Sequence, residues 1–166
     1  MRLVRGRAAG DADDLLDALR AVADDHGVTV QAFDARYVAD RAHLERAVEL
    51  ADRARDRDEA IARDRAVEIL LYAAGRRQIE RALEMGVTDD GPVVVLVDDP
   101  EGDSEREAAA AAAVEECPEL VLEESVAPDE AAVCEFFRIG ERERAATGAS
   151  LAELVRERVA LLVVER

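Results

Sequence analysis

The sequence predicts an α+β fold, with helices packed on a small mixed or antiparallel sheet in a single domain over residues 1–166. Apolar residues make up 49% of the 166 residues, which is enough for a packed core. Short runs with strand patterning alternate with longer segments whose apolar residues recur at i, i+3, i+4 and i+7. The chain shows no internal repeat and no obvious linker, so we expect one domain.

The first part of the chain predicts the order strand, helix, strand. Residues 2–8 (RLVRGRA) suit a short strand, and a helix is expected over about 13–26. Gly27 suits the left-handed residue that closes a helix. The apolar side of this helix comprises Leu15, Leu16, Leu19 and Val22. The segment 28–35 (VTVQAFDA) then alternates as a half-buried strand does.

The centre of the chain is predicted to be helical. Asp40 can cap a helix whose apolar stripe comprises Leu44, Ala47, Val48 and Ala51. The charged run 55–64 has no such stripe and indicates a solvated connection. From Asp64 the apolar spacing resumes, and Gly75 interrupts it. We therefore expect two short helices, or one kinked helix, over 64–85 with a hinge at Gly75.

Strands and helices alternate again in the second half. The apolar run 93–97 (VVVLV) suits a strand covered on both faces, and residues 120–122 (LVL) suit another strand. Between them, the alanine run 108–113 favours helix. Further helices are expected over about 129–137, 141–146 and 150–166. The last six residues could equally pair as a strand.

The charge balance indicates a salty cytoplasm. All 22 basic residues are Arg, against 39 Asp and Glu, for a net charge of -17. Such a surface repels itself in dilute buffer, whereas molar salt shortens the screening length to about 3 Å. We expect a protein of a halophilic archaeon, and an acidic protein from a GC-rich genome is the alternative. The sequence has neither a long apolar run nor a signal-peptide core, so we expect a cytoplasmic protein with no membrane partner.

No complete catalytic or metal-binding motif is present. Residues 93–99 (VVVLVDD) resemble the acid-ended strand of phosphate-loop enzymes, but the chain lacks GxxxxGK[ST] and has no Lys. Cys117 and Cys134 match no metal or redox spacing. Two cysteines could form one disulfide, but in a cytosolic protein we expect two free, core-facing thiols. His26 and His43 are too few for a histidine-rich metal site, and packing or solvent contact is the ordinary role for His43 in the first turn of its helix. We expect no enzyme activity, no metal and no cofactor.

One segment departs from the acidic balance. Residues 63–81 carry a net charge of +2, whereas the remaining chain carries -19. Arg76 and Arg77 directly follow Gly75, and Gln78 adds an amide. A guanidinium group binds phosphate or carboxylate and stacks on bases. The alternative is a helix surface whose arginines pair with neighbouring acids.

Residues 33–54 and 66–87 resemble the small kinase-binding subunit of the KEOPS (EKC) tRNA-modification complex, the TPRKB-type family. The likeness includes the strand before the first central helix and the HL..A start of that helix at His43. It also includes the signature EILLY..G.RQI..A...G, which begins at Glu68. The VVVLV strand and the closing LxELVRERVALL segment also fit. The likeness therefore covers nearly the whole chain, and residues 101–117 are its least recognisable part.

The resemblance implies a non-catalytic regulatory subunit of the KEOPS complex. Its partner would be the small atypical kinase/ATPase of that complex, with other subunits contacted only indirectly. Archaeal relatives also bind the CCA end of tRNA, and the assembly supports threonylcarbamoyladenosine modification. The alternatives are a purely protein-binding regulator of the kinase without RNA contact, and a small enzyme that uses scattered carboxylates.

Two sets of contact residues follow as expectations. The RNA-binding set, taken from the charge window and the signature, is Arg65, Tyr72, Arg76, Arg77 and Gln78. The kinase-binding set, taken from the closing helix, is Leu151, Leu154, Val155 and Arg158. Tyr72 follows two apolar residues and suits the core as well, and the kinase-binding residues could equally be buried.

Overall fold

The structure, a computed structural model, describes residues 1–164 and confirms the α+β class. The chain forms two compact units, one from Met1–Ala35 with Gly86–Val126, the other from Arg36–Met85 with the segment that begins at Ala127. The chain passes between the units three times, so neither unit is one continuous segment. The single domain expected over 1–166 stays a prediction.

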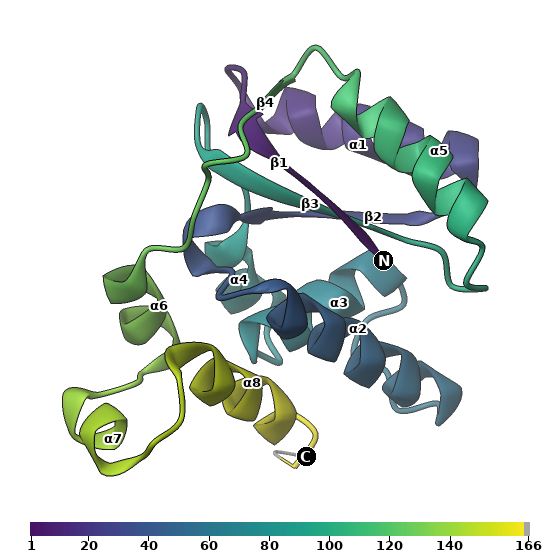
Figure 1. Cartoon of the computed structure of the whole chain (residues 1–166). Coiled ribbons are helices and arrows are strands. Elements are labelled where there is room, and N and C mark those ends of the chain that lie inside the picture. The colour runs from purple at the N-terminus through teal and green to yellow at the C-terminus, as the bar shows by residue number, and fades with distance from the viewer. Residues whose placement is uncertain (165–166) are drawn as a thin grey trace. The chain divides into compact units, whose positions relative to one another are not determined.

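The first unit is a four-stranded sheet with two helices. Its elements are β1 (Arg2–Ala8), α1 (Ala12–His26), β2 (Thr29–Asp34), β3 (Pro92–Asp98), α5 (Ser104–Glu115) and β4 (Leu120–Leu122). The strand order is β2-β3-β1-β4, and each neighbouring pair is antiparallel. Helices α1 and α5 lie together on one face of the sheet (Figure 1). Of the two sheet types expected, the antiparallel one is therefore present.

The core of the first unit lies between that face and the two helices. Successive strand side chains alternate in direction, so every second residue of β1 and β3 joins the core. The core includes Val4, Ala8, Leu15, Leu19, Val93, Val95, Val97, Ala110 and Val114. The short strand β4 can pair with β1 because Gly6 has no side chain. A Cβ atom there would lie 2.4 Å from the Val121 carbonyl oxygen.

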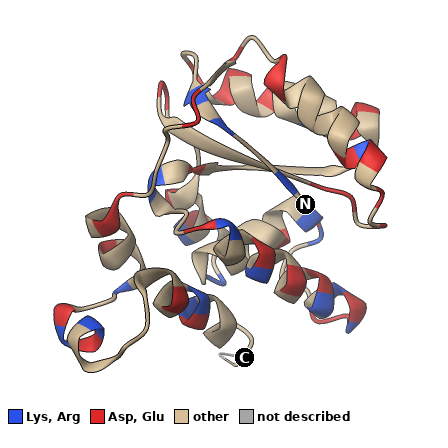
Figure 2. Cartoon of the chain, viewed as in Figure 1, with Lys and Arg blue, Asp and Glu red and all other residues tan. Residues whose placement is uncertain are grey.

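The second unit is helical. It comprises α2 (Arg41–Asp56), α3 (Arg65–Ala74), α4 (Ile79–Ala82), η2 (Leu83–Met85), α6 (Glu130–Phe137), α7 (Glu141–Ala146) and α8 (Leu151–Leu161), preceded by Arg36 and Tyr37 of the 3-10 turn η1 (Ala35–Tyr37). Acidic and basic positions are interspersed along α2 (Figure 2). Helix α2 packs on α3 and on α8.

Local signals define the ends of these helices. The Asp40 carboxylate accepts a hydrogen bond from the His43 backbone N–H at 2.7 Å, as an N-cap does. Gly75, at φ +59°, ends α3 in the left-handed conformation, and α4 starts four residues later. This confirms two short helices with a break at Gly75. The break directs the chain away from α3, and it places Arg76 immediately after the turn.

Two buried polar side chains fix α2 and α3. The His43 ring accepts a hydrogen bond from the Ala39 N–H at Nδ1 and, through Nε2, donates one to the Ala73 carbonyl at 2.8 Å. The Glu68 carboxylate accepts hydrogen bonds of 2.7–3.1 Å from the N–H groups of residues 61 and 62. The charged connection before α3 is therefore tied to the helix it precedes, although most of its side chains are exposed.

The remaining expectations concern the end of the chain and the cysteines. Helix α8 ends at Leu161 and residues 162–164 form a turn, not a strand, while residues 165–166 lie outside the described residues. Cys117 and Cys134 are both free and half-buried. Within residues 1–164, no helix combines the length and the apolar character needed to cross a bilayer.

Candidate functional site

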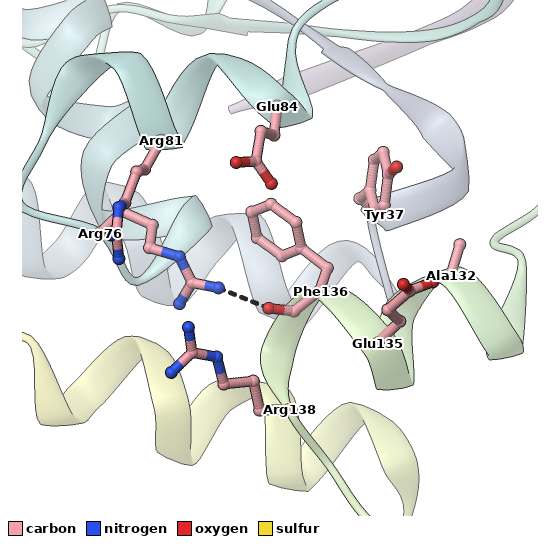
Figure 3. Close-up of a pocket in the computed structure, with 8 residues that line it drawn as sticks. All are labelled: Tyr37, Arg76, Arg81, Glu84, Ala132, Glu135, Phe136 and Arg138. Atoms are coloured by element: carbon pink, nitrogen blue, oxygen red, sulfur yellow. Dashed lines mark hydrogen bonds between the residues drawn. The ribbon is translucent and has the colours of Figure 1, made fainter.

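The second unit contains a cavity of about 470 Å³ lined by arginines and aromatic rings (Figure 3). Its volume falls within the range of about 300–1,000 Å³ that is typical of ligand pockets. The lining residues are Tyr37, Arg76, Arg81, Glu84, Ala132, Glu135, Phe136 and Arg138. They come from η1, the turn after α3, α4, η2 and α6, so the fold assembles the cavity from segments far apart in the sequence.

Arg76 is held against an aromatic ring. Its guanidinium carbon lies 4.8 Å from the centroid of the Phe136 ring, and the same group donates a hydrogen bond to the Phe136 carbonyl. Because Gly75 breaks the helix just before it, Arg76 can turn toward α6. A guanidinium stacked on a ring keeps its charge and loses few of its conformations on binding an anion.

The two rings of the cavity contact each other in a tilted arrangement. The ring centroids of Tyr37 and Phe136 are 5.1 Å apart, with an interplanar angle of 47°. The Asp129 N–H donates a hydrogen bond to the Arg36 carbonyl at 2.9 Å, which joins η1 to the start of α6 and brings Tyr37 beside Phe136. The chain has only five Phe and Tyr residues, and two of them line this cavity.

A chain of ring contacts continues inward to the buried histidine. Phe136 contacts Phe137 edge-on, with centroids 4.9 Å apart, and Phe137 contacts His43 edge-on at 5.6 Å. Burial lowers the pKa of His43 to about 4, and this outweighs the opposing effects of the Ala73 carbonyl and of Asp40. His43 is therefore neutral near pH 7, and its hydrogen bonds assign it a packing role.

Arg138 adopts an unfavourable backbone conformation beside Arg76. It caps the C-terminus of α6 at φ +54°, in the left-handed region that costs a non-glycine residue about 1–2 kcal/mol. Its guanidinium group has no hydrogen bond or ion pair among the described residues, and it extends toward Arg76 in Figure 3. Backbone strain is concentrated at functional sites, and here it brings a second guanidinium group beside Arg76.

A second cavity of about 280 Å³ shares three arginines with the first. Its lining comprises Gly75, Arg76, Arg81, Phe137, Arg138, Arg158 and Leu161, with no carboxylate. Arg158 is fixed there by Glu143, whose two oxygens lie 2.7 and 2.8 Å from one guanidinium nitrogen, and by the Phe137 carbonyl. Four guanidinium groups, one of them paired with Glu143, therefore surround this cavity, and guanidinium groups bind phosphate and carboxylate.

The RNA-binding set expected from the sequence divides into two groups. Arg76 lines both cavities, and Arg77 and Gln78 are exposed on the same turn. Arg65 instead forms a two-bond ion pair with Asp52 at 2.7 Å, and its side chain is 10% exposed. Tyr72 is 2% exposed, so its ring has no open face for a base. Arg65 and Tyr72 thus belong to the packing of the fold.

Of the residues that line the larger cavity, sequence reasoning selected only Arg76 and missed the others, including both rings and two arginines. Tyr37, Phe136 and Arg138 lie outside the charge window, and Arg81 lies within it but was not selected. The pair of phenylalanines followed by an arginine, at the end of a predicted helix, is the signal that could have indicated α6. No local sequence pattern indicates that Tyr37 contacts α6.

The kinase-binding set from the closing helix is largely internal. Leu154 and Val155 are buried, at 3% and 0% exposure, whereas Leu151 is half-buried. Arg158 is also half-buried and engaged with Glu143. Among the described residues of the second unit, the exposed large apolar side chains are Ile79, Leu83, Leu161 and Val164.

Comparison with known proteins assigns the chain to a family. No curated protein sequence matches the chain. A protein-family model described as kinase binding protein CGI-121 matches residues 10–162, which include every residue that lines the two cavities. The match extends over far more than half of the sequence. The chain therefore belongs to the family of kinase binding protein CGI-121.

Proposed function

We propose that this protein is a non-catalytic regulatory subunit of the KEOPS complex. In this role it binds the atypical kinase/ATPase subunit and the CCA end of tRNA, and it supports threonylcarbamoyladenosine modification. Family membership supports the kinase partner. The observation that carries the RNA contact is that Arg76 and Arg138 line one cavity with the contacting rings of Tyr37 and Phe136.

A single-stranded RNA end matches the chemistry of these cavities. Each nucleotide offers a phosphate to a guanidinium group and an aromatic face to a ring, and stacking on a ring contributes about 1–3 kcal/mol per base. Tyr37 takes the stacking role first considered for Tyr72, because its ring lines the cavity. Arg76, Arg77 and Gln78 remain proposed contacts, and Arg81 and Arg138 join them.

The RNA contact is tested by binding to whole tRNA and to the same tRNA without its CCA end, in molar KCl. The test variant is Arg77→Glu/Arg81→Glu, since both side chains are exposed and neither has an ion pair among the described residues. The matched control is Arg142→Glu, an exposed arginine of α7 outside both cavities. Circular dichroism checks that each variant folds.

We expect trimming or the double variant to weaken binding at least about tenfold, because two attractive charges become repulsive. The control should bind as the wild type does. Equal or absent binding to whole and trimmed tRNA would refute the RNA contact. It would favour the alternative, a purely protein-binding regulator whose arginines meet acids on the kinase.

For the kinase we propose the exposed side of α8, around Leu151, Arg158 and Leu161, the last two of which also line the smaller cavity. Protein interfaces are depleted of charge at their centre and polar at their rim, and Leu161 is 47% exposed. Leu161→Glu should weaken capture of the purified kinase subunit. Leu122→Glu, an equally exposed leucine of the first unit at 51%, is the control. Unchanged capture by the Leu161 variant would exclude this surface.

A further inference from the structure

Two carboxylates lie among the arginines of the larger cavity without pairing with them. Glu84 and Glu135 line the cavity together with Arg76, Arg81 and Arg138, yet neither carboxylate has a hydrogen bond or an ion pair among the residues described. Both residues are exposed. In Figure 3 the Glu84 carboxylate projects from η2 toward the Phe136 ring, between Arg81 and Tyr37. Both carboxylates therefore line the cavity that contains the two rings.

The acids divide the site into two chemically different parts. No carboxylate lines the smaller cavity, and the nearby Glu143 is already paired with Arg158. The larger cavity instead combines the two free carboxylates with the rings of Tyr37 and Phe136. The smaller cavity suits a phosphate, whereas the larger one suits a flat group that offers hydrogen-bond donors.

We propose that Glu84 and Glu135 select RNA bases that carry an exocyclic amino group. The inference rests on the proposed function, since it concerns the nucleotides bound at this site. An ionised carboxylate only accepts hydrogen bonds, and it accepts well from the amino groups at N4 of cytosine and N6 of adenine. Uracil has a carbonyl oxygen at the corresponding position, which a carboxylate repels.

The test compares two tRNAs that differ only in the last three nucleotides, CCA or UUU, together with the trimmed tRNA. Binding is measured by fluorescence anisotropy in molar KCl. The proteins are the wild type, the variant Glu84→Gln/Glu135→Gln, and the control Glu80→Gln. Glu80 is an exposed residue of α4 that lines neither cavity. The substituted side chains are all exposed, and circular dichroism confirms that the variants fold.

We expect the wild type and the control to bind the CCA tail about tenfold more tightly than the UUU tail, as one charge-assisted hydrogen bond allows. In the double variant this preference should fall below about threefold, because a glutamine amide can also donate to the uracil carbonyl. The proposal is overturned if the wild type binds both tails equally, or if the preference persists in the double variant. In both of those cases, loss of binding on trimming still supports the RNA contact. If the protein binds the CCA, UUU and trimmed tRNAs equally well, both the base selection and the proposed RNA contact are overturned.

Discussion

His43 is expected to make the protein sensitive to mild acid. The ring is fully buried, with Nδ1 accepting from the Ala39 N–H and Nε2 donating to the Ala73 carbonyl. Burial lowers its pKa from 6.5 to about 4, so the folded protein keeps the ring neutral where an unfolded chain would bind a proton. Protonation of the folded state would remove the Nδ1 acceptor and place a charge in the core.

The sign and size of the effect follow from linkage. Between about pH 6.5 and pH 4 the unfolded state binds more protons than the folded state, so the free energy of unfolding falls as the pH falls. The stabilisation is complete above the unfolded pKa of 6.5 and is lost as the pH drops through this window. At about 1.4 kcal/mol per pH unit, the loss is about 2 kcal/mol at pH 5 and about 3 kcal/mol at pH 4.

Two measurements check this prediction. The chain has only two histidines, so in a His26→Gln variant the single histidine Cε1–H signal in an NMR titration belongs to His43. That signal should stay constant from pH 7 to pH 5 and begin to shift near pH 4. The second measurement is urea unfolding at pH 7 and at pH 5. Between these two values the free energy of unfolding should fall by about 2 kcal/mol more in His26→Gln than in His26→Gln/His43→Gln. A titration midpoint near 6.5, or equal losses in the two proteins, would refute the reasoning.

Three further predictions concern stability. Gly75→Ala should lower the free energy of unfolding by about 1–2 kcal/mol, because φ is +59° and the added Cβ would lie 3.3 Å from the Arg158 carbonyl oxygen. The control is Gly148→Ala, where the added Cβ meets open space. In the same urea titration it should lower the free energy of unfolding much less. Glu68→Gln should lower the free energy of unfolding by about 1–3 kcal/mol, because a donor amide replaces one oxygen that accepts backbone N–H groups. The exposed Glu80→Gln serves as control. Equal changes in the free energy of unfolding for the two variants would contradict the role of the buried carboxylate. The thermal midpoint should rise between 0.1 and 2 M KCl as salt screens the net charge of -17, so a constant or falling midpoint in calorimetry would contradict the repulsion argument.

Most elements of the fold were predicted because their signals are local. The strand at 120–122 and the helix at 141–146 have the expected bounds, and β3 extends the expected 93–97 by one residue at each end. Helix α2 continues into the charged run to Asp56, where an apolar stripe is no longer needed. Ion pairs one turn apart, such as Arg53 with Glu49, support its exposed side.

The candidate site was predicted only where its residues are neighbours in sequence. The charge window indicated Arg76, but it also counted Arg65, whose partner Asp52 lies outside the window and on another helix. The contact between Tyr37 and Phe136 depends on how η1 meets α6, which no periodicity encodes. Leu154 was selected from the apolar stripe of an amphipathic helix, and it is buried because such a stripe marks the face that packs within the fold.

The acidity of the whole chain explains why a nucleic-acid site here would be a cavity and not a basic surface. With a net charge of -17, long-range attraction cannot draw a polyanion to this protein, and in molar salt charges beyond about 3 Å are screened. Only contacts at hydrogen-bond and stacking distance then contribute. Arg76 held on the Phe136 ring satisfies that condition, because its charge is placed before a ligand arrives. Binding at such a site should therefore release few counterions and depend weakly on salt, as stacking interactions do.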